Sequence, residues 1–133
     1  MQYLLDTNIC IYIIKGQPEA TIARFRREPL NSIGISSITL AELQYGIAKS
    51  AFPERNKSAL GKFLLPLIVL PFDSAASQHY GSLRAELERQ GKPIGALDML
   101  IAAHALSENL IVVTNNETEF GRVPGLRMEN WAR

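Results

Sequence analysis

The feature that most limits the possible folds is a series of short, mostly apolar runs separated by segments with helical periodicity. The runs are Tyr3–Leu5, Ile33–Ser36, Ile68–Leu70 and Leu110–Val113. Runs of this length, apolar at nearly every position rather than at alternate positions, are typical of strands that are buried on both faces. The sequence therefore predicts a parallel sheet that is covered by helices on both sides.

Six helices are expected between these strands. Their apolar residues recur at the three- and four-residue spacings of a helix with one buried face, and Pro18 and Pro53 stand where a first helical turn tolerates proline. The expected ranges are 9–16, 18–28, 39–49, 53–65, 74–90 and 95–109. Strands and helices together predict an α/β fold, a three-layer α/β/α sandwich with a mainly parallel central sheet, forming a single domain over residues 1–133.

Length and composition agree with one globular domain. The 133 residues are 47% hydrophobic and 20% charged, which excludes a disordered chain. The 14 basic and 13 acidic residues give a net charge of +1, so overall charge indicates no particular partner. Cys10 is the only cysteine, so no internal disulfide can form.

The longest apolar stretch, residues 63–72, contains two prolines and is too short to span a bilayer. We therefore expect a cytoplasmic protein without membrane contact.

Acidic side chains lie close to the strand ends, where parallel sheets bind their ligands. Asp6 ends the first strand, Glu42 lies early in the helix after the second, and Asp98 lies near the start of the helix before the last strand. Asn116 and Glu119 come just after that strand. Because ligands of such sheets bind beyond the carboxyl ends of the strands, we expect these side chains at one end of the fold.

A divalent metal ion would explain this grouping. Carboxylates held close together repel one another and retain protons unless a cation lies between them. Oxygen ligands without histidine or cysteine indicate Mg²⁺ or Mn²⁺ rather than zinc. Structural interpretations are open as well. Asp6 could cap the following helix, and Glu42 could complete a capping box with Thr39. Asp98 could complement a helix dipole, and Glu119 could be an ordinary surface acid.

Four segments resemble the successive acidic motifs of the PIN-domain ribonucleases. They are YLLDTNICIYIIK, ISSITLAELQYGIAKS, RQGKPIGALDMLIAAHAL and VVTNNETEF. Taken singly the first two are weak signals, whereas the stretch PIG-x-x-D followed by a helix is stronger and the ordered set is highly specific. The likeness covers nearly the whole chain and is closest to the VapC-type toxins of bacterial type II toxin–antitoxin systems.

The resemblance implies a PIN-like nuclease domain over residues 1–133 that acts as a metal-dependent endoribonuclease. Asp6, Glu42 and Asp98 match the metal-coordinating acids of that family. The fourth acidic position, often Asp in the family, is Asn116 here, and Glu119 would replace it directly or through water. Asp6, Glu42, Asp98 and Glu119 would then carry catalysis with Mg²⁺ or Mn²⁺ as cofactor. Two such ions roughly 4 Å apart can activate water and stabilise the leaving oxygen.

The resemblance also implies the partners. The expected substrate is RNA, above all tRNA, cut in an exposed loop so that translation stops. The expected assembly is a homodimer that a VapB-type antitoxin neutralises in a toxin–antitoxin hetero-oligomer. The antitoxin would lie across the apolar side chains of the first two helices, with a basic residue reaching the carboxylates. These side chains are Ile9, Ile13, Ile14, Ile22 and Phe25.

The distribution of charge agrees with a polyanionic substrate. Setting aside the four acids of the expected site leaves nine acidic residues against 14 basic ones. Lys15, Arg84, Arg89 and Lys92 come from segments next to the site and are candidates for holding phosphates. The alternative is a non-catalytic RNA- or protein-binding regulatory module on the same fold, an interpretation that Asn116 at the fourth acidic position favours.

Overall fold

A five-stranded sheet forms the centre of the computed structural model, which describes residues 1–132. The strands are β1 (Tyr3–Leu5), β2 (Ile33–Ser36), β3 (Ile68–Leu70), β4 (Ile111–Val113) and β5 (Met128–Glu129). Their order across the sheet is β3-β2-β1-β4-β5, and every neighbouring pair is parallel. Leu4 of β1 lies beside Gly34 on one side and Val112 on the other. Because β1 is central, Asp6 directly after it lies in the middle of the carboxyl edge.

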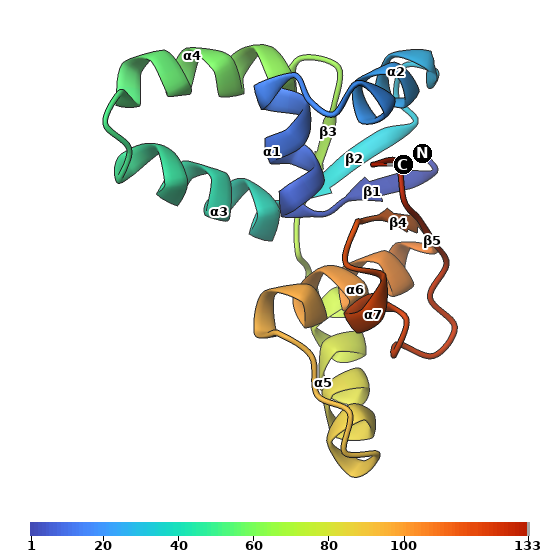
Figure 1. Cartoon of the computed structure of the whole chain (residues 1–133). Helices are drawn as coiled ribbons and strands as arrows, with labels where there is room; N and C mark the ends of the chain where they lie inside the picture. The colour runs from blue at the N-terminus through green and yellow to red at the C-terminus, as the bar shows by residue number, and fades with distance from the viewer. Residues whose placement is uncertain (133) are drawn as a thin grey trace.

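Helices cover both faces of the sheet (Figure 1). The seven helices of the described residues are α1 (Thr7–Lys15), α2 (Glu19–Arg27), α3 (Ser37–Ala48), α4 (Pro53–Leu64), α5 (Ser74–Arg89), α6 (Ala96–Glu108) and α7 (Glu117–Phe120). Tyr3 and Leu5 pack with α1, α3 and α4, whereas Leu4 packs with α5, α6 and α7 on the opposite face. This is the predicted three-layer α/β/α sandwich, and its sheet is wholly parallel.

Short polar side chains set where the helices begin. Asp6 caps α1 by accepting a hydrogen bond from the Ile9 amide at 2.9 Å, and Gly16 ends that helix in the left-handed conformation at φ 79°. Ser36 caps α3 by accepting from the Ile38 amide at 3.1 Å. The two helices that follow the central strands therefore start immediately at the carboxyl edge.

Three details of the sequence prediction were wrong. Helix α3 begins at Ser37 instead of Thr39, because Ser36 provides the cap. Thr39 is therefore inside the helix, and Glu42 cannot form a capping box with it. Leu97 has the spacing of the buried face expected for the helix over 95–109, yet it is 42% exposed because it lies in the first turn of α6, at the rim of a pocket.

Two elements were not predicted, the four-residue helix α7 and the two-residue strand β5. Both are too short to produce a periodic sequence pattern. Strand β5 forms by pairing with β4, where Met128 lies beside Val112, so its existence depends on tertiary contacts. None of the helices within residues 1–132 is long and apolar enough to cross a membrane.

Candidate active site

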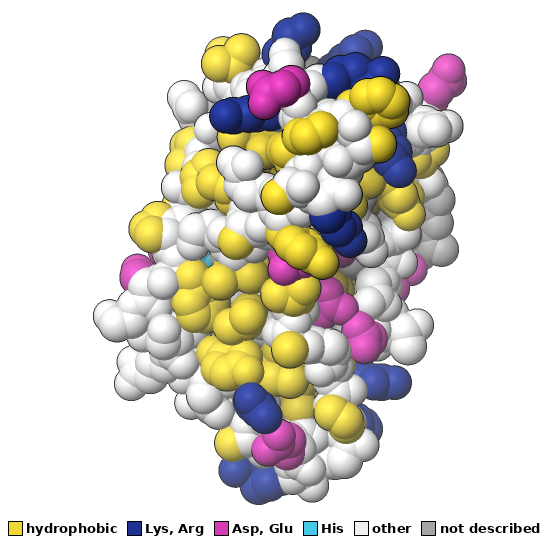
Figure 2. Space-filling view, turned by 90° about the vertical axis from the view of Figure 1, so that its left-hand side faces the viewer, with side chains coloured by type: hydrophobic (Ala, Val, Ile, Leu, Met, Phe, Trp, Pro, Cys, Tyr) yellow, Lys and Arg dark blue, Asp and Glu magenta, His cyan; other side chains and the backbone are white. Residues whose placement is uncertain are grey.

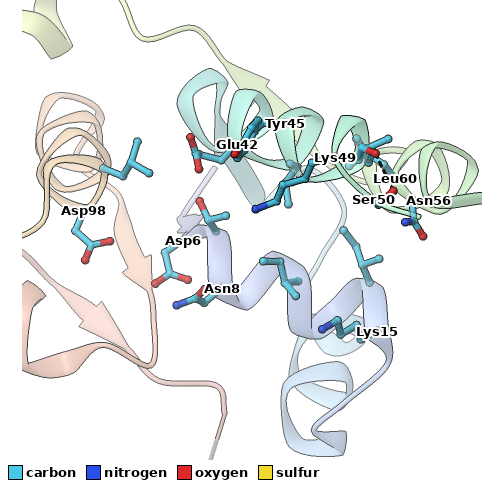
Figure 3. A pocket seen from close by; sticks show the side chains of 17 residues that line it. Asp6, Asn8, Lys15, Glu42, Tyr45, Lys49, Ser50, Asn56, Leu60 and Asp98 are labelled. Carbon is cyan, nitrogen blue, oxygen red and sulfur yellow. Dashed lines mark hydrogen bonds between the residues drawn. The ribbon is translucent and has the colours of Figure 1, made fainter. Parts of the chain in front are cut away.

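A pocket of about 710 Å³ opens between α1, α3, α4 and the start of α6 (Figure 3). Asp6, Glu42 and Asp98 line it, and Figure 3 shows their carboxylates projecting toward one region from three different elements. The parallel sheet explains this placement, because each acid lies close to the carboxyl edge on which the strands end. Asn116 and Glu119 lie beside Asp98, just outside the residues that line the pocket.

Asp6 is buried and held by both of its carboxylate oxygens. Its side chain is 3% exposed; Oδ1 accepts from the Ile9 amide at 2.9 Å, and Oδ2 accepts from the Thr114 hydroxyl. Burial raises the pKa of Asp6 above its ordinary value, while the hydrogen bonds from Thr114 and the backbone lower it. The structural interpretation of Asp6, that it caps the following helix, is confirmed. Its carboxylate nevertheless faces the pocket.

Glu42 reaches the pocket from α3 and is half-buried. The start of α3 is fixed by the Ser36 cap, and the Thr7 hydroxyl at the start of α1 donates to Thr39 Oγ1 at 3.4 Å. These contacts tie α3 to α1 within a turn of Glu42. They set the position from which the Glu42 carboxylate enters the pocket, on the side of the helix that carries Asp98 (Figure 3).

Asp98, Asn116 and Glu119 form a hydrogen-bonded group. The Asn116 side-chain amide donates to Asp98 Oδ2 at 3.1 Å and to Glu119 Oε2 at 2.9 Å, and the Gly95 amide donates to Glu119 Oε1 at 3.2 Å. Burial, followed by the nearby Glu119 carboxylate, raises the pKa of Asp98 to about 7. The pKa of Glu119 is lowered because protonated Asp98 donates to it. The two carboxyl groups therefore share one proton near neutral pH.

Thr114 connects this group to Asp6. Its hydroxyl is fully buried, donates to Asp6 Oδ2 and accepts from the Asn116 backbone amide at 2.9 Å. The turn after β4 therefore orients both Asp6 and the Asn116 side chain. Thr114 was not among the predicted site residues, and its position directly after the last strand was the available signal.

The acids converge without completing a coordination sphere. Within residues 1–132, no three or more His, Cys, Asp or Glu side chains lie close enough together to hold a metal ion. The donor set nevertheless fits a hard divalent cation, since the ligating atoms are all oxygens. Burial, followed by the acidic neighbours, raises the pKa of Asp98 to about 7, and a cation would relieve the repulsion from those neighbours.

The predicted phosphate-binding residues are mostly elsewhere. Lys15 lines the pocket, whereas Arg84 and Arg89 form exposed ion pairs with Glu88 and Glu86 along α5 and do not line it. Lys92 is also absent from the lining.

The lining residues that were missed include Tyr45 and Lys49. Tyr45 lies three residues after Glu42 on the same face of α3, and Lys49 lies seven residues after Glu42, where the helix ends; this spacing was a signal in the sequence.

The surface proposed for an antitoxin is partly core. Ile9 is fully buried, so it cannot belong to an exposed surface. Ile13 and Phe25 are half-buried against the core, with the Phe25 ring 6.1 Å from that of Phe63, and Ile14 lines the pocket. The apolar side chains of α1 and α2 therefore serve the core first, and the part that remains accessible is smaller than predicted.

Fold and site together define a recognised class of protein. The sequence profile of the PIN domain family matches residues 3–126, which is most of the chain. This match covers strands β1 to β4 and the acids at the carboxyl edge of the sheet.

Full-length relatives narrow the class. The chain is 49% identical over 132 residues to the tRNA(fMet)-specific endonuclease VapC of Shigella flexneri, covering 99% of both sequences. The structure of DNA-bound VapBC from Salmonella typhimurium superposes with a TM-score of 0.93 at 49% identity, covering 98% of each chain. That of VapBC2 from Rickettsia felis, bound to a promoter DNA fragment, gives 0.90 at 47% identity, covering 98% of this chain and 99% of that one. The chain therefore belongs to the VapC ribonucleases of the PIN domain family.

Proposed function

We propose that this chain is a metal-dependent endoribonuclease toxin in which Asp6, Glu42 and Asp98 bind the metal. One observation carries the proposal: in a member of the VapC ribonucleases, these acids project from three elements into one pocket (Figure 3). The substrate is tRNA, by analogy with the relatives that are named for tRNA(fMet) cleavage. The whole chain, residues 1–133, acts as one nuclease domain, and cleavage of tRNA stops translation.

The bound cofactor is Mg²⁺ or Mn²⁺, which lowers the pKa of a water molecule and neutralises charge on the phosphate when it is present. The residues of the chain prepare the site for it. Asp6 is oriented by the Ile9 amide and the Thr114 hydroxyl, so it needs little rearrangement. Asp98 gives up the proton that it shares with Glu119.

Asn116 and Glu119 fill the fourth acidic position jointly. Asn116 holds Asp98 and Glu119 together through its amide, and Glu119 supplies the negative charge that an aspartate would supply there. The pKa of Glu119 is below its ordinary value, so this carboxylate is ionised at neutral pH. It remains near the site as a proton acceptor.

The partner is a VapB-type antitoxin, since the structural relatives are VapBC complexes. The toxin is a cytoplasmic homodimer that joins the antitoxin in a hetero-oligomer. A basic antitoxin residue satisfies the same crowded carboxylates as the metal and so competes with it.

Incubation of the purified protein with total tRNA tests the proposal. We expect discrete cleavage products in Mg²⁺ and none in EDTA, and no cleavage by the Asp6→Asn variant with its fold intact. Equal cleavage in EDTA would contradict the metal mechanism. The non-catalytic module that Asn116 allows predicts a different result. RNA binding would then persist in EDTA and in Asp6→Asn, and no turnover would occur in Mg²⁺ or Mn²⁺.

A further inference from the structure

The pocket continues beyond the carboxylates into a region of different chemistry. Asp6, Glu42 and Asp98 line one part of it, and Tyr45, Lys49, Lys15 and apolar side chains line the remainder (Figure 3). Besides Leu97 of α6, the apolar contribution comes from α1, α3 and α4, namely Ile11, Ile14, Leu43, Ile47 and Leu60. A site that only held a metal ion would need none of these residues.

Tyr45 is an exposed aromatic residue on the same face of α3 as Glu42. Its side chain is 59% exposed, and the Lys49 ammonium lies 4.7 Å from the centre of its ring. At 1.5 Å of rise per residue, Tyr45 lies about 5 Å and Lys49 about 10 Å beyond Glu42 along the helix. Figure 3 shows the Tyr45 ring beside Glu42 and Lys49 extending across the pocket toward α1.

The lysines of this region have no acidic partner. Neither Lys15 nor Lys49 takes part in an ion pair among the ion pairs of residues 1–132, whereas Arg24, Arg84 and Arg89 all do. On this face of the molecule a small group of acidic side chains lies at mid-height among hydrophobic ones, with basic side chains above and below it (Figure 2). A ligand that crosses the face therefore meets cations after it leaves the carboxylates.

We propose that Tyr45 and Lys49 form a nucleotide subsite, in which an unpaired base next to the scissile phosphate stacks on Tyr45 and a flanking phosphate binds Lys49. This rests on the proposed RNA cleavage. An exposed cation–π contact is weak compared with a base stacked on an aromatic ring, so an incoming base displaces Lys49 and frees it for the phosphate. A basic antitoxin residue fits the carboxylate part of the pocket but not the part around Tyr45, because Lys15 and Lys49 would repel it there.

The first test measures cleavage of a synthetic RNA hairpin that spans the site the wild-type protein cuts in total tRNA. If the wild type cuts no RNA, the proposed function fails before any variant is compared. If it does, Tyr45→Leu should raise KM about 10-fold or more with kcat within about threefold, because a stacked base is lost from substrate and transition state alike. Tyr45→Phe should stay within about twofold of wild type, because the ring is kept.

Phe52→Leu is the matched control. Phe52 is equally exposed at 59% and carries its own cation, with the Arg55 guanidinium 4.6 Å from its ring centre, but it does not line the pocket. We expect its KM to be that of the wild type. An equal rise in KM for Phe52→Leu and Tyr45→Leu, or no rise for Tyr45→Leu, would overturn the subsite.

The second test identifies the base and the phosphate separately. Replacing single nucleotides of the hairpin by abasic residues should reveal one position next to the cut at which KM rises for wild type but not for Tyr45→Leu. Binding in EDTA then tests the phosphate contact. Lys49→Gln should reduce the slope of log Kd against log salt concentration by about 0.7, the value for one phosphate contact with a single strand. Lys57→Gln, which lies outside the pocket, should leave the slope unchanged. The assignment would be contradicted if no abasic position behaved in this way, or if Lys49→Gln had the same salt slope as the wild type.

A third outcome for Tyr45→Leu would also overturn the subsite. If RNA cleavage is unchanged while antitoxin binding weakens, or while the oligomeric state in sedimentation changes, Tyr45 belongs to a protein interface.

Discussion

The charge on Asp98 depends on three neighbours. Burial and the Glu119 carboxylate raise its pKa to about 7, and the Asn116 amide lowers it. Because the folded protein favours the neutral form of Asp98, the stability that this proton provides is complete below the unfolded pKa near 4. It is lost as pH rises to about 7. The metal-free protein therefore carries unfavourable charge at this position above neutral pH.

Replacing Asp98 by asparagine should show this charge directly. The new side-chain amide would donate to Glu119 as the protonated acid does, without ionising. We expect Asp98→Asn to have the melting temperature of the wild type near pH 4 and a higher one, by at least about 2 °C, at pH 8 in EDTA. Cleavage should be lost at both pH values. A difference in melting temperature that does not grow between pH 4 and pH 8 would contradict the shared proton.

Replacing Asn116 by aspartate tests the fourth acidic position. The new carboxylate removes the amide that bridges Asp98 and Glu119 and adds a negative charge to them. We expect a lower melting temperature in EDTA at pH 8 and tighter Mn²⁺ binding by calorimetry. Asn115→Asp, at an exposed neighbour that bonds to Tyr12, is the control and should change neither quantity by a comparable amount. Unchanged Mn²⁺ affinity would exclude position 116 from the metal environment.

The principal acids of the site were predictable because they depend on strand order, and strand order follows from an α/β pattern. Asp6, Glu42 and Asp98 were predicted to lie together and do line one pocket. Thr114 was not predictable from periodicity, because its role depends on the distance between separate elements. Arg84 was only a candidate for holding a phosphate, and its helix pairs it with Glu88 on the surface.

Helices α3 and α6, which carry Glu42 and Asp98, are joined by a buried polar contact. His104 on α6 is fully buried, and its Nδ1 lies 2.8 Å from the Oγ of Ser36, the cap of α3. The Phe72 ring packs edge-on against the imidazole at 5.4 Å. Burial lowers the pKa of His104, so the ring is neutral at physiological pH. The contact therefore fixes the relative position of two acid-bearing helices.

Ser36→Ala removes the cap and the contact together. It leaves the Ile38 amide and a buried imidazole nitrogen without their partner, which should cost about 1–3 kcal/mol of unfolding free energy. Urea unfolding measures this quantity. Ser58→Ala on the exposed side of α4 is the control and should stay within about 0.5 kcal/mol of wild type. An equal effect of both substitutions would remove the proposed role of Ser36.

The arrangement of elements was largely predictable, and the short elements were not. All four predicted strands and six predicted helices are present, because each has enough residues to show a pattern. Strand β5 and helix α7 have only two and four residues, and they exist because β4 and the turn after it provide partners.

At the scale of the whole molecule, antitoxin and metal are proposed to compete for one set of charges. The antitoxin is proposed to place a basic residue against Asp6, Glu42 and Asp98, and Ile13, expected to contact it, is half-buried against the core. Inhibition of tRNA cleavage by the antitoxin should therefore weaken as Mg²⁺ is raised at constant ionic strength. Inhibition that is independent of Mg²⁺ would show that the antitoxin acts away from the carboxylates.

Ile13→Lys tests the antitoxin surface. If the accessible part of Ile13 contacts the antitoxin, the added charge should weaken the complex while a melting curve still shows a folded protein. Because Ile13 also packs against the core, some loss of stability is expected as well. A folded variant with full antitoxin affinity would remove Ile13 from the interface.

The most direct measurement of the central claim is a crystal structure of the protein soaked in Mn²⁺, with anomalous diffraction to locate the ion. The account predicts an anomalous peak in the pocket within ligand distance of Asp6 and Asp98, with Glu42 bound directly or through water. The peak should be absent from Asp98→Asn crystals grown in the same way. A protein that cleaves tRNA in Mn²⁺ but shows no peak between these carboxylates, or binds the ion elsewhere, would contradict the account.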